Sequence, residues 1–353
     1  MLTLGIETSC DETSCAVLEG LDKVRSNIIS SSLFRHKPFG GVVPEIASRH
    51  SLEQIDFVFQ EALDEAKIKS KDIDLIAVTE GPGLIGSLLV GVSFAKTLAY
   101  GLGVPLIGVN HLEAHLSANF IGHKEPAHYV GLLVSGGHTI LVYQKKGKST
   151  RLGETVDDAA GEAYDKVAKI LGLGFPGGPV IDKLAKEGNP KAFKFTKPKQ
   201  KGYFDFSFSG IKTAVLYLVE KQDVGAPPRG RPQLLFSGPA QGPAPPLLNS
   251  QFVNDVCASF QYAVVAWLVE KTLAAADVKK VADIVVGGGV SANSYLRKRL
   301  PEEAAKRGLK VWFPPNRLTT DNAAMIARRG AELFRRGRRS SMKLTGNANL
   351  KLG

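Results

Sequence analysis

Apolar and polar positions alternate along the first third of the chain in short runs bounded by turn residues. Alternation with a period of two is typical of strands, and recurrence every three or four positions is typical of helices. Pro44 suits the first turn of a helix, where its missing N–H costs nothing. The pattern predicts the order strand, strand, strand, helix, strand, helix, strand, at 2–9, 13–20, 23–31, 44–67, 74–81, 81–103 and 105–111.

The same order recurs in the rest of the chain, interrupted by a long middle section. Two copies of a mixed α/β unit imply two lobes, and clefts between lobes hold ligands. No residue-level identity links the two halves, so the repeat is architectural. It predicts three strands, a helix, a strand, a helix, a strand and a final helix, at 129–137, 139–146, 150–157, 160–172, 283–289, 291–307, 310–315 and 322–336.

The length of 353 residues also exceeds what a single hydrophobic core usually serves. We expect an N-terminal lobe at 1–126 and a C-terminal lobe at 127–321, with a C-terminal helix at 322–338 that packs back on the first lobe. Residues 225–246 are rich in proline and glycine, which continue neither a helix nor a central strand. We interpret this segment as a surface insertion, with a lid as the alternative.

The composition is that of an ordinary globular protein, with 44% hydrophobic and 22% charged residues. The three cysteines, Cys10, Cys15 and Cys257, are too few for a disulfide framework and fit a reducing compartment. The N-terminus lacks the basic start and apolar stretch of a signal peptide, and no uninterrupted apolar run approaches the ~18 residues of a membrane helix. These features predict a cytoplasmic protein that does not associate with membranes.

The chain is basic, with 45 Lys and Arg against 34 Asp and Glu and a formal net charge of +11. Residues 191–201 carry five lysines and no acid, and residues 328–343 carry seven basic side chains against Glu332 alone. Together the two segments could form one footprint on a phosphate backbone. A basic surface that only keeps the protein in solution is the alternative, and charge alone does not separate the two.

Two predicted strand turns carry short polar groups suited to phosphate binding. Residues 5–17 (GIETSCDETSCAV) place Asp11 and Glu12 among serines and threonines, and residues 135–139 (SGGHT) expose the N–H groups of two adjacent glycines. A polar hairpin tip explains either turn equally well when it is taken alone. Two matched turns that face one cleft would form a phosphate clamp.

Two further segments are rich in glycine. Residues 283–293 (DIVVGGGVSAN) place three glycines between a strand and a helix, which fits either close approach to a ligand or a plain tight connection. Residues 172–182 (GLGFPGGPVID) end in Asp182, a carboxylate suited to a pair of sugar hydroxyls. Neither segment has the spacing of a dinucleotide-binding fingerprint or a P-loop.

The sharpest chemical feature is the sequence NHLEAH at 110–115. His111 and His115 are spaced i, i+4, which places both imidazoles on one helix face within reach of one metal ion. Glu113 lies about 200° around the helix from His111, so it cannot serve as the base of a zinc protease. Asp321, at the start of the last helix, is the candidate third ligand. Histidines with a purely structural role are the usual alternative.

The chain resembles, nearly end to end, the universal tRNA N6-adenosine threonylcarbamoyltransferase family, formerly described as O-sialoglycoprotein endopeptidases. Such a set of motifs in one order is far more specific than any single motif, and the lack of a fused kinase domain favours the bacterial and organellar form. The matching motifs are GIETSCDETS (5–14), PEIASRH (44–50), GPGLIGSL (81–88), NHLEAH (110–115), LLVSGGHT (132–139), GETVDDAAGEAYDKVAK (153–169), FPGGP (175–179), FSFSGIKTA (206–214), GGGVSAN (287–293) and TDNAAMIA (320–327).

The resemblance implies an α/β fold of the duplicated, two-lobed actin/sugar-kinase/Hsp70 type with a central cleft, in agreement with the repeat. It implies one divalent metal ion, iron in the first place or zinc, held by His111, His115 and Asp321. It also implies that an adenine nucleotide and threonylcarbamoyl-AMP bind in the cleft. The substrate-binding residues would be Leu133, Val134, Ser135, Gly136, Gly137, Asp165, Gly178, Asp182 and Asn293.

Members of this family transfer the threonylcarbamoyl group from threonylcarbamoyl-AMP to the exocyclic amine of the adenosine that follows the anticodon, in tRNAs that read codons starting with A. The implied partners are the tRNA anticodon arm, held by the basic segments, a degenerate paralogous subunit, a small P-loop ATPase and an upstream threonylcarbamoyl-AMP synthase. Because AMP is a good leaving group, the amine needs little activation. Asp11 or Glu12 would accept its proton.

Two other functions remain open at this point. A sugar or acetate-type kinase shares the fold and the phosphate turns, but it has no reason to carry the pair His111 and His115. A non-catalytic assembly subunit would keep the fold and lose the metal ligands, whereas all three are present here.

Overall fold

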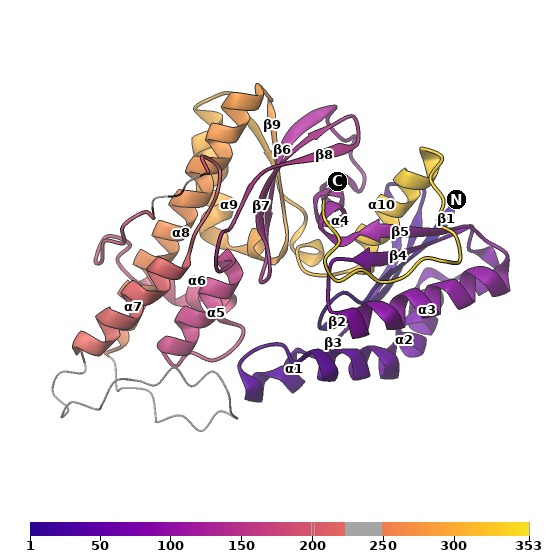
Figure 1. Ribbon diagram of the computed structural model, residues 1–353, viewed down its shortest axis with the longest axis horizontal. Helices are drawn as coiled ribbons and strands as arrows, with labels where there is room; N and C mark the ends of the chain where they lie inside the picture. The colour runs from indigo at the N-terminus through magenta and orange to yellow at the C-terminus, as the bar shows by residue number, and fades with distance from the viewer. Residues whose placement is uncertain (199, 201, 223–248, 353) are drawn as a thin grey trace.

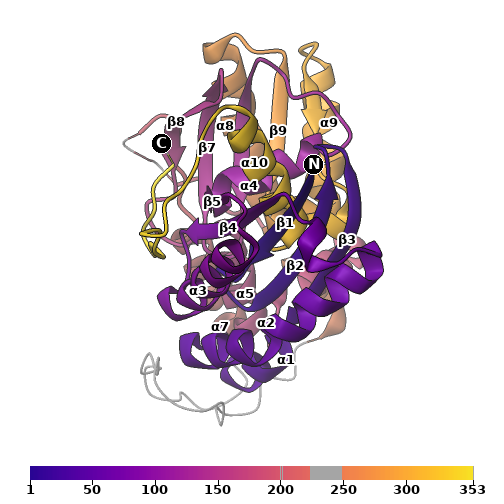
Figure 2. The same ribbon diagram turned by 90° about the vertical axis from the view of Figure 1, so that its right-hand side faces the viewer.

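The computed structural model describes residues 1–198, 200, 202–222 and 249–352. The insertion expected at 225–246 lies outside the described residues. The described chain is built around two mixed sheets of five strands each, with helices on their faces (Figures 1 and 2).

The first sheet has the order β3-β2-β1-β4-β5. Its first three strands form an antiparallel meander, and β4 and β5 run parallel to β1. Each strand coincides with a predicted one to within a few residues. The strands are β1 (Leu2–Glu7), β2 (Glu12–Glu19), β3 (Lys23–Ser31), β4 (Leu75–Gly81) and β5 (Leu106–Asn110).

The second sheet repeats this topology strand for strand, in the order β8-β7-β6-β9-β10. An antiparallel meander is again followed by two parallel strands, which confirms the predicted duplication of the fold. The lobe boundary that we placed between residues 126 and 127 falls between β5 and β6 and stays a prediction. The strands are β6 (His128–Val134), β7 (Thr139–Lys145), β8 (Lys148–Glu154), β9 (Asp283–Gly287) and β10 (Lys310–Trp312).

Ten α-helices cover the sheets in the described parts of the chain. Four of them, α1, α6, α7 and α8, fall where the sequence analysis named no element. The longest, α8, buries residues around most of its circumference, so its sequence lacks the one-sided apolar stripe that would predict a surface helix. The helices are α1 (Leu33–His36), α2 (Pro44–Ala66), α3 (Ile85–Leu102), α4 (His111–Ser117), α5 (Ala160–Ile170), α6 (Gly177–Leu184), α7 (Ser209–Gln222), α8 (Ser250–Lys279), α9 (Ser294–Ala305) and α10 (Ala323–Arg335).

The helix expected at 81–103 begins later, at Ile85, and the prediction of its start is wrong. The C-terminal segment of the chain occupies the backbone groups that precede it. The N–H of Asn347 donates to the carbonyl of Glu80 at 2.8 Å, and the N–H of Gly83 donates to the carbonyl of Ala348 at 3.3 Å. These long-range bonds hold the loop in an extended course that sequence pattern alone does not reveal.

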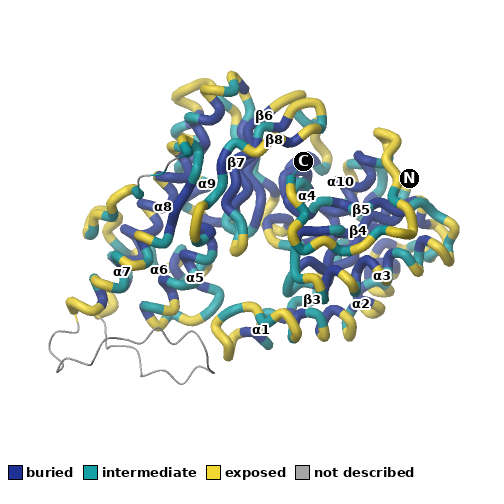
Figure 3. Tube along the Cα trace, in the orientation of Figure 1, coloured by how far each residue is buried: buried dark blue, intermediate teal, exposed yellow. Residues whose placement is uncertain are grey.

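The first sheet is buried on both faces (Figure 3). On one face the side chains of Leu4 and Ile6 pack against α2 and α3. On the other face α10 lies across β1, β2 and β4, as the sequence led us to expect for the last helix. A β-carbon at Gly5 would collide with backbone atoms of Ala323 and Ala327, so glycine lets α10 approach the strand closely.

The second sheet packs its outer face against α5, α8 and α9, which share one large core with it. Its inner face is covered by the short helix α4, through Leu112 and Leu116 against Leu133 and Val285. Because α4 also packs against α10, these two helices form the layer that joins the sheets. Figure 1 shows α4 and α10 lying between the two sheets.

A buried ionic network holds α4 to α10. Arg329 of α10 donates from Nε and Nη2 to Oε2 of Glu113 on α4, at 3.1 and 2.7 Å. Its Nη1 donates to Glu332 at 2.9 Å. Arg328 and Arg329 are each 3% exposed, so neither is available to a phosphate backbone. The basic segment predicted at 328–343 is therefore an external surface only from Arg335 onward.

Two helices in the described residues, α3 and α8, are long and apolar enough to cross a membrane by length and composition, although neither is an uninterrupted apolar run. About two thirds of the apolar window of α8 is buried inside the protein, as in the core helix of a globular protein, against 33% for α3. The three cysteines are free thiols, as expected.

Candidate metal centre

The two histidines predicted to bind metal open the helix α4. Asn110 is its N-cap, because its side-chain oxygen accepts from the N–H groups of Leu112 and Glu113 at 3.0 and 3.3 Å. His111 and His115 therefore lie one turn apart on one face, with ring centroids 4.6 Å apart. Their Nε2 atoms face each other at 3.2 Å, and both side chains are buried. The predicted i, i+4 pairing is confirmed.

Asp321 completes the group from the other central helix. It lies two residues before α10, whose N-cap is Asn322. Its Oδ1 is 3.1 Å from Nε2 of His115 and 3.5 Å from Nε2 of His111. The three ligand atoms lie within 4.8 Å of one another, close enough to hold one metal ion. Glu113 points away from this group to Arg329, as its helical position predicted.

A fourth residue, Glu7, orients His111 from behind, and the sequence analysis did not single it out. Its carboxylate is fully buried at the end of β1. It accepts hydrogen bonds from Thr79 Oγ1 at 2.7 Å and from the N–H of Ser9 at 2.5 Å. Nδ1 of His111 lies 2.9 Å from the same carboxylate and 3.2 Å from Oγ of Ser9. A proton on Nδ1 satisfies the carboxylate and leaves Nε2 free to bind metal.

The charges around His111, His115 and Asp321 favour a positive charge between them. Burial opposes a charge on His111, but the carboxylates of Glu7 and Asp321 raise its pKa to about 9. Burial likewise opposes the charge on Asp321, but His111 and His115 lower its pKa to about 2. The three acceptor atoms therefore favour a shared proton or a metal ion between them. Two imidazoles and one carboxylate suit Fe²⁺ or Zn²⁺.

The turn between β1 and β2 carries Asp11 and Glu12, the two predicted proton acceptors. Burial first, and then the charges of Asp321 and Asp11, raise the pKa of Glu12 well above its ordinary value. Oγ of Ser31 donates to Glu12 at 3.2 Å. The same three causes raise the pKa of the Cys10 thiol. The turn is therefore close enough to Asp321 for their charges to interact, and the role of its carboxylates as proton acceptors stays a prediction.

The matching turn of the second sheet, residues 135–138, lies at the end of β6. Oγ of Ser135 accepts from the N–H of His138 at 3.1 Å, and Gly136 and Gly137 are exposed. Burial and the nearby His111 and His115 lower the pKa of His138 to about 4. This neutral imidazole beside the metal ligands is a second residue that the sequence analysis did not select, although it had named the turn.

Other predicted binding residues differ in what they can offer a ligand. The side chains of Leu133 and Val134 are buried in the sheet, so only their backbone could contact a substrate. The loop after β9 approaches the same place, because a β-carbon at Gly288 would collide with the carbonyl of Val134. Gly288 also has a φ of 92°, which glycine adopts without strain. Two glycine turns thus meet at the carboxyl ends of two parallel strands, the usual place for ligands in such sheets.

The remaining predicted residues gather around α6. Oδ1 of Asp165 accepts from the N–H of Gly177 at 2.7 Å, next to Gly178. Burial, and then Glu162 and Asp11, raise the pKa of Asp165, so its carboxyl lies near the turn of the first sheet. Asp182 accepts from Nδ2 of Asn293 at 3.2 Å. The structure therefore brings the second-sheet residues into one region that faces the first sheet.

The two basic segments do not form one footprint. Residues 191–198 lie along α8, where Phe193 packs on Phe252 and Lys197 pairs with Glu270. The exposed end of 328–343 follows α10 on the opposite side of Figure 1. The charge in these segments is concentrated, as predicted, but the fold separates them.

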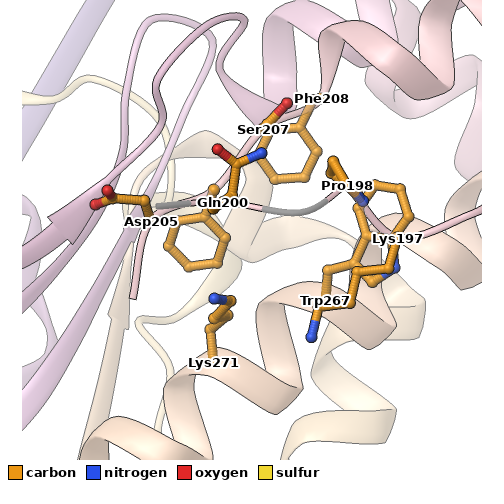
Figure 4. A pocket seen from close by; sticks show the side chains of 9 residues that line it. Lys197, Pro198, Gln200, Asp205, Ser207, Phe208, Trp267 and Lys271 are labelled. Carbon is orange, nitrogen blue, oxygen red and sulfur yellow. The ribbon is translucent and has the colours of Figure 1, made fainter. Parts of the chain in front are cut away.

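A pocket beside α8 is unrelated to the metal centre. It lies between the 197–208 segment and α8, and Trp267 and Lys271 form its helical wall (Figure 4). None of the predicted site residues lines it.

Comparison with known proteins gives a consistent assignment. The model of a family described as tRNA N6-adenosine threonylcarbamoyltransferase matches residues 23–328. A protein of that name from Thermosipho africanus is 51% identical over 356 residues, covering 100% of both chains. Another from Dictyoglomus turgidum is 49% identical over 355 residues, covering 100% of this chain and 99% of its own.

Among solved structures, HypF from T. kodakarensis superposes with a TM-score of 0.58 at 14% identity, covering 95% of this chain and 48% of its own. Full-length HypF in a phosphate- and nucleotide-bound form gives a TM-score of 0.56 at 13% identity, covering 94% of this chain and 46% of its own. At such identities the likeness concerns the fold alone, and it agrees with the duplicated actin/sugar-kinase/Hsp70-type architecture.

Replacing Glu7 by Gln is expected to weaken metal binding by about 10- to 100-fold, the usual effect of losing a carboxylate that orients a metal-binding histidine. The amide keeps the size of the side chain but can donate to Nδ1 of His111, which would shift the proton to Nε2. Co²⁺ titration against a competing chelator measures the affinity, and ¹⁵N shifts of the imidazole report the tautomer. Glu80→Gln, a partly buried carboxylate on β4, is the matched control. An affinity within two-fold of the wild type would contradict this role.

Metal binding is also expected to release a proton. With its pKa raised to about 9, His111 is protonated at neutral pH, so an incoming ion must displace that proton. The apparent affinity for Co²⁺ should rise about ten-fold per pH unit between pH 6 and 8 and level off above the pKa. Calorimetry in buffers of different ionisation enthalpy counts the protons released. An affinity that does not change with pH would show that His111 is already neutral.

Proposed function

This chain belongs to the tRNA N6-adenosine threonylcarbamoyltransferase family, and from that premise we propose how its central site carries out the transfer. The donor is threonylcarbamoyl-AMP, and the acceptor is the exocyclic amine of the adenosine that follows the anticodon, in tRNAs that read codons starting with A. One observation carries the proposal: His111, His115 and Asp321 converge from two helices next to the glycine turns of the second sheet.

The metal half of the site comes from α4 and the approach to α10. A divalent ion, Fe²⁺ or Zn²⁺, held by His111, His115 and Asp321 would polarise an oxygen of the threonylcarbamoyl group or of its phosphate. Glu7 keeps His111 in the tautomer that such binding needs. Because both histidines are buried, they lose little freedom when they bind.

The nucleotide half of the site comes from the second sheet. In the turn that begins at Ser135, whose own N–H donates to the carbonyl of His138, the exposed residues Gly136 and Gly137 offer N–H groups that suit the phosphate of the adenylate. Asp182 and Asn293, already hydrogen-bonded to each other, suit the ribose hydroxyls. The backbone of Leu133 and Val134, together with Asp165 and Gly178, would line the rest of the nucleotide. This arrangement directs the acyl end of the donor toward the first sheet.

The reaction exchanges one bond for another. The adenosine amine attacks the carbamoyl carbon, a C–N bond forms, and the C–O bond to the phosphate breaks as AMP leaves. The proton from the amine passes to Asp11 or Glu12 at the turn of the first sheet. Burial first, and then the charge of Asp321, raise the pKa of Glu12, and a bound cation would lower that pKa and so favour the ionised carboxylate that can accept a proton.

Partner subunits are proposed on the same premise. The outer faces of α2 and α3 expose large apolar side chains, among them Leu52 and Leu89, which are 68% and 46% exposed. These two lie at one level of the helix pair, because Ser48 is close to Gly86 and Phe59 contacts Phe94. Such a surface suits the degenerate paralogous subunit. A small P-loop ATPase and an upstream threonylcarbamoyl-AMP synthase complete the proposed cytoplasmic system.

A kinase-like function is the alternative that the fold leaves open. The buried group of His111, His115 and Asp321 speaks against it, because phosphoryl transfer from ATP needs no such ligand set. It equally speaks against a non-catalytic assembly subunit, which gains nothing from three converging ligands. ATP turnover without transfer to tRNA would favour the kinase.

The deciding experiment incubates the metal-loaded chain with labelled threonylcarbamoyl-AMP and unmodified tRNA, with and without the partner subunits. His111→Ala is expected to lose bound metal and to lower transfer by at least about 100-fold, because metal ions contribute several kcal/mol to such reactions. The exposed His128→Ala is the control and should keep both. Full transfer by His111→Ala would refute the metal assignment, and no transfer by the wild type in any combination would refute the proposed function.

The two carboxylates of the turn can be separated by isosteric variants. Whichever residue accepts the proton should lose about 10²- to 10⁴-fold in transfer rate as Asp11→Asn or Glu12→Gln, with metal content unchanged. The variant of the other carboxylate should keep the acidic limb of the wild-type pH–rate profile. If both variants retain the wild-type rate, neither carboxylate is the base.

A further inference from the structure

The fold brings together two basic segments that are far apart in sequence. The composition of the chain pointed to only one of them, residues 328–343. The turn between β7 and β8 (KKGK, 145–148) is at the same place as the end of α10. We propose that they form one RNA-binding surface, which contacts the phosphate backbone of the tRNA arm whose adenosine reaches the metal centre. This inference rests on the proposed function. The surface, named here the hairpin–α10 surface, comprises Lys145, Lys146, Lys148, Arg335, Arg336, Arg338 and Arg339, all of them exposed.

The contact between the two segments is direct. A β-carbon at Gly147 would collide with the guanidinium of Arg336, so the arginine rests against the tip of the hairpin. Gly147 has a φ of 75° and Lys146 a φ of 52°, which makes a tight turn that points its lysines outward. Arg336 is held in place by Glu332 at 2.5 Å. Figures 1 and 2 both place the hairpin of β7 and β8 beside the last turn of α10.

The charges of this surface are largely uncompensated. Of its seven cations, only Arg336 has a carboxylate within 4.0 Å among the described residues. Some other exposed cations are paired, as Arg299 is with Glu302 and Glu303, and others, such as Lys67 and Lys71, have no carboxylate within 4.0 Å among the described residues, so the number of unpaired cations near one another is what distinguishes this surface. Burial raises the pKa of Glu80 and the charge of Arg338 lowers it, so Glu80 is an acidic neighbour of Arg338. Cations on two neighbouring segments with so few counter-charges repel one another, and a polyanion relieves that repulsion.

A structural role explains only part of this arrangement. Arginines near the end of α10 are favoured by the partial negative charge of a helix C-terminus. The three lysines of the hairpin do not belong to a helix terminus, so the helix dipole does not explain them, yet they lie on the same surface. Their placement beside Arg336 is therefore explained by a common ligand.

The distance to the metal centre indicates the size of that ligand. Asp321 lies just before α10, and the helix is 13 residues long, which corresponds to about 20 Å. A mononucleotide bound at the metal centre cannot span that distance. Residues 323–333 of α10 are buried, so this length is a separation through the protein and not a path along its surface. An RNA arm carries regularly spaced phosphates over such a length, so a substrate whose base lies at the metal ligands is large enough to reach this surface as well.

The test uses two charge-reversal variants of the full chain, assayed with its partner subunits. One is Lys145→Glu/Lys146→Glu/Lys148→Glu, and the other is Arg335→Glu/Arg338→Glu/Arg339→Glu, which spares Arg336 because it pairs with Glu332. The control reverses three exposed lysines elsewhere, Lys67→Glu/Lys69→Glu/Lys71→Glu. Affinity for unmodified tRNA is measured at several salt concentrations, because each lost phosphate contact lowers the slope of log K against log salt by about 0.7 to 0.9.

Both surface variants should bind tRNA at least about ten-fold more weakly, with the salt slope reduced by about two. Transfer at saturating tRNA should stay near the wild-type rate, with the loss confined to KM for tRNA. An unchanged slope in the hairpin variant, or an equal loss in the control, would overturn the proposed surface. If the wild type binds tRNA through this surface but transfers nothing, the proposed function fails and the surface stands.

Discussion

The packing of α4 against α10, which buried ion pairs stabilise, is the constraint on which the rest of the molecule depends. Arg329 bridges Glu113 of one helix and Glu332 of the other, in a place from which water is largely excluded. Removing one member of such a network leaves an unpaired buried charge, which typically costs about 3–5 kcal/mol. The network therefore specifies one relative placement of the two helices. Because α4 covers the second sheet and α10 the first, that placement also sets how the two sheets face each other.

The candidate metal centre is a consequence of this placement. His111 and His115 belong to α4, and Asp321 belongs to the approach to α10, so their convergence requires the two helices to be held together. Glu7 adds a third segment, because β1 ends directly behind His111. A site built from three elements around a rigid interface needs little reorganisation when it binds, which favours tight and well-oriented coordination.

The duplicated fold divides the chemistry between its halves. In each half a meander is followed by parallel strands, and polar turns lie where the strands end. The first half carries Asp11, Glu12 and the two candidate metal-binding histidines, whereas the second carries the glycine turns, and the candidate ligand Asp321 comes from the segment just before α10. The close approaches at Gly161 and Gly288 show how tightly these turns pack on one another. An activated adenylate and an acceptor amine, which must meet in one orientation, suit a site divided in this way.

The sequence alone determined the alternating order of strands and helices, the internal repeat and the helical pairing of His111 with His115, because all three depend on local periodicity. Asp321 was reached as a third ligand because it opens a predicted helix, although nothing local stated where that helix would pack. Only the tertiary structure decided that Glu7 lies behind His111, that Arg328 and Arg329 are buried, and that the 145–148 turn joins the end of α10. Each of these depends on contacts between residues more than a hundred positions apart, which no local pattern of hydrophobicity or charge encodes.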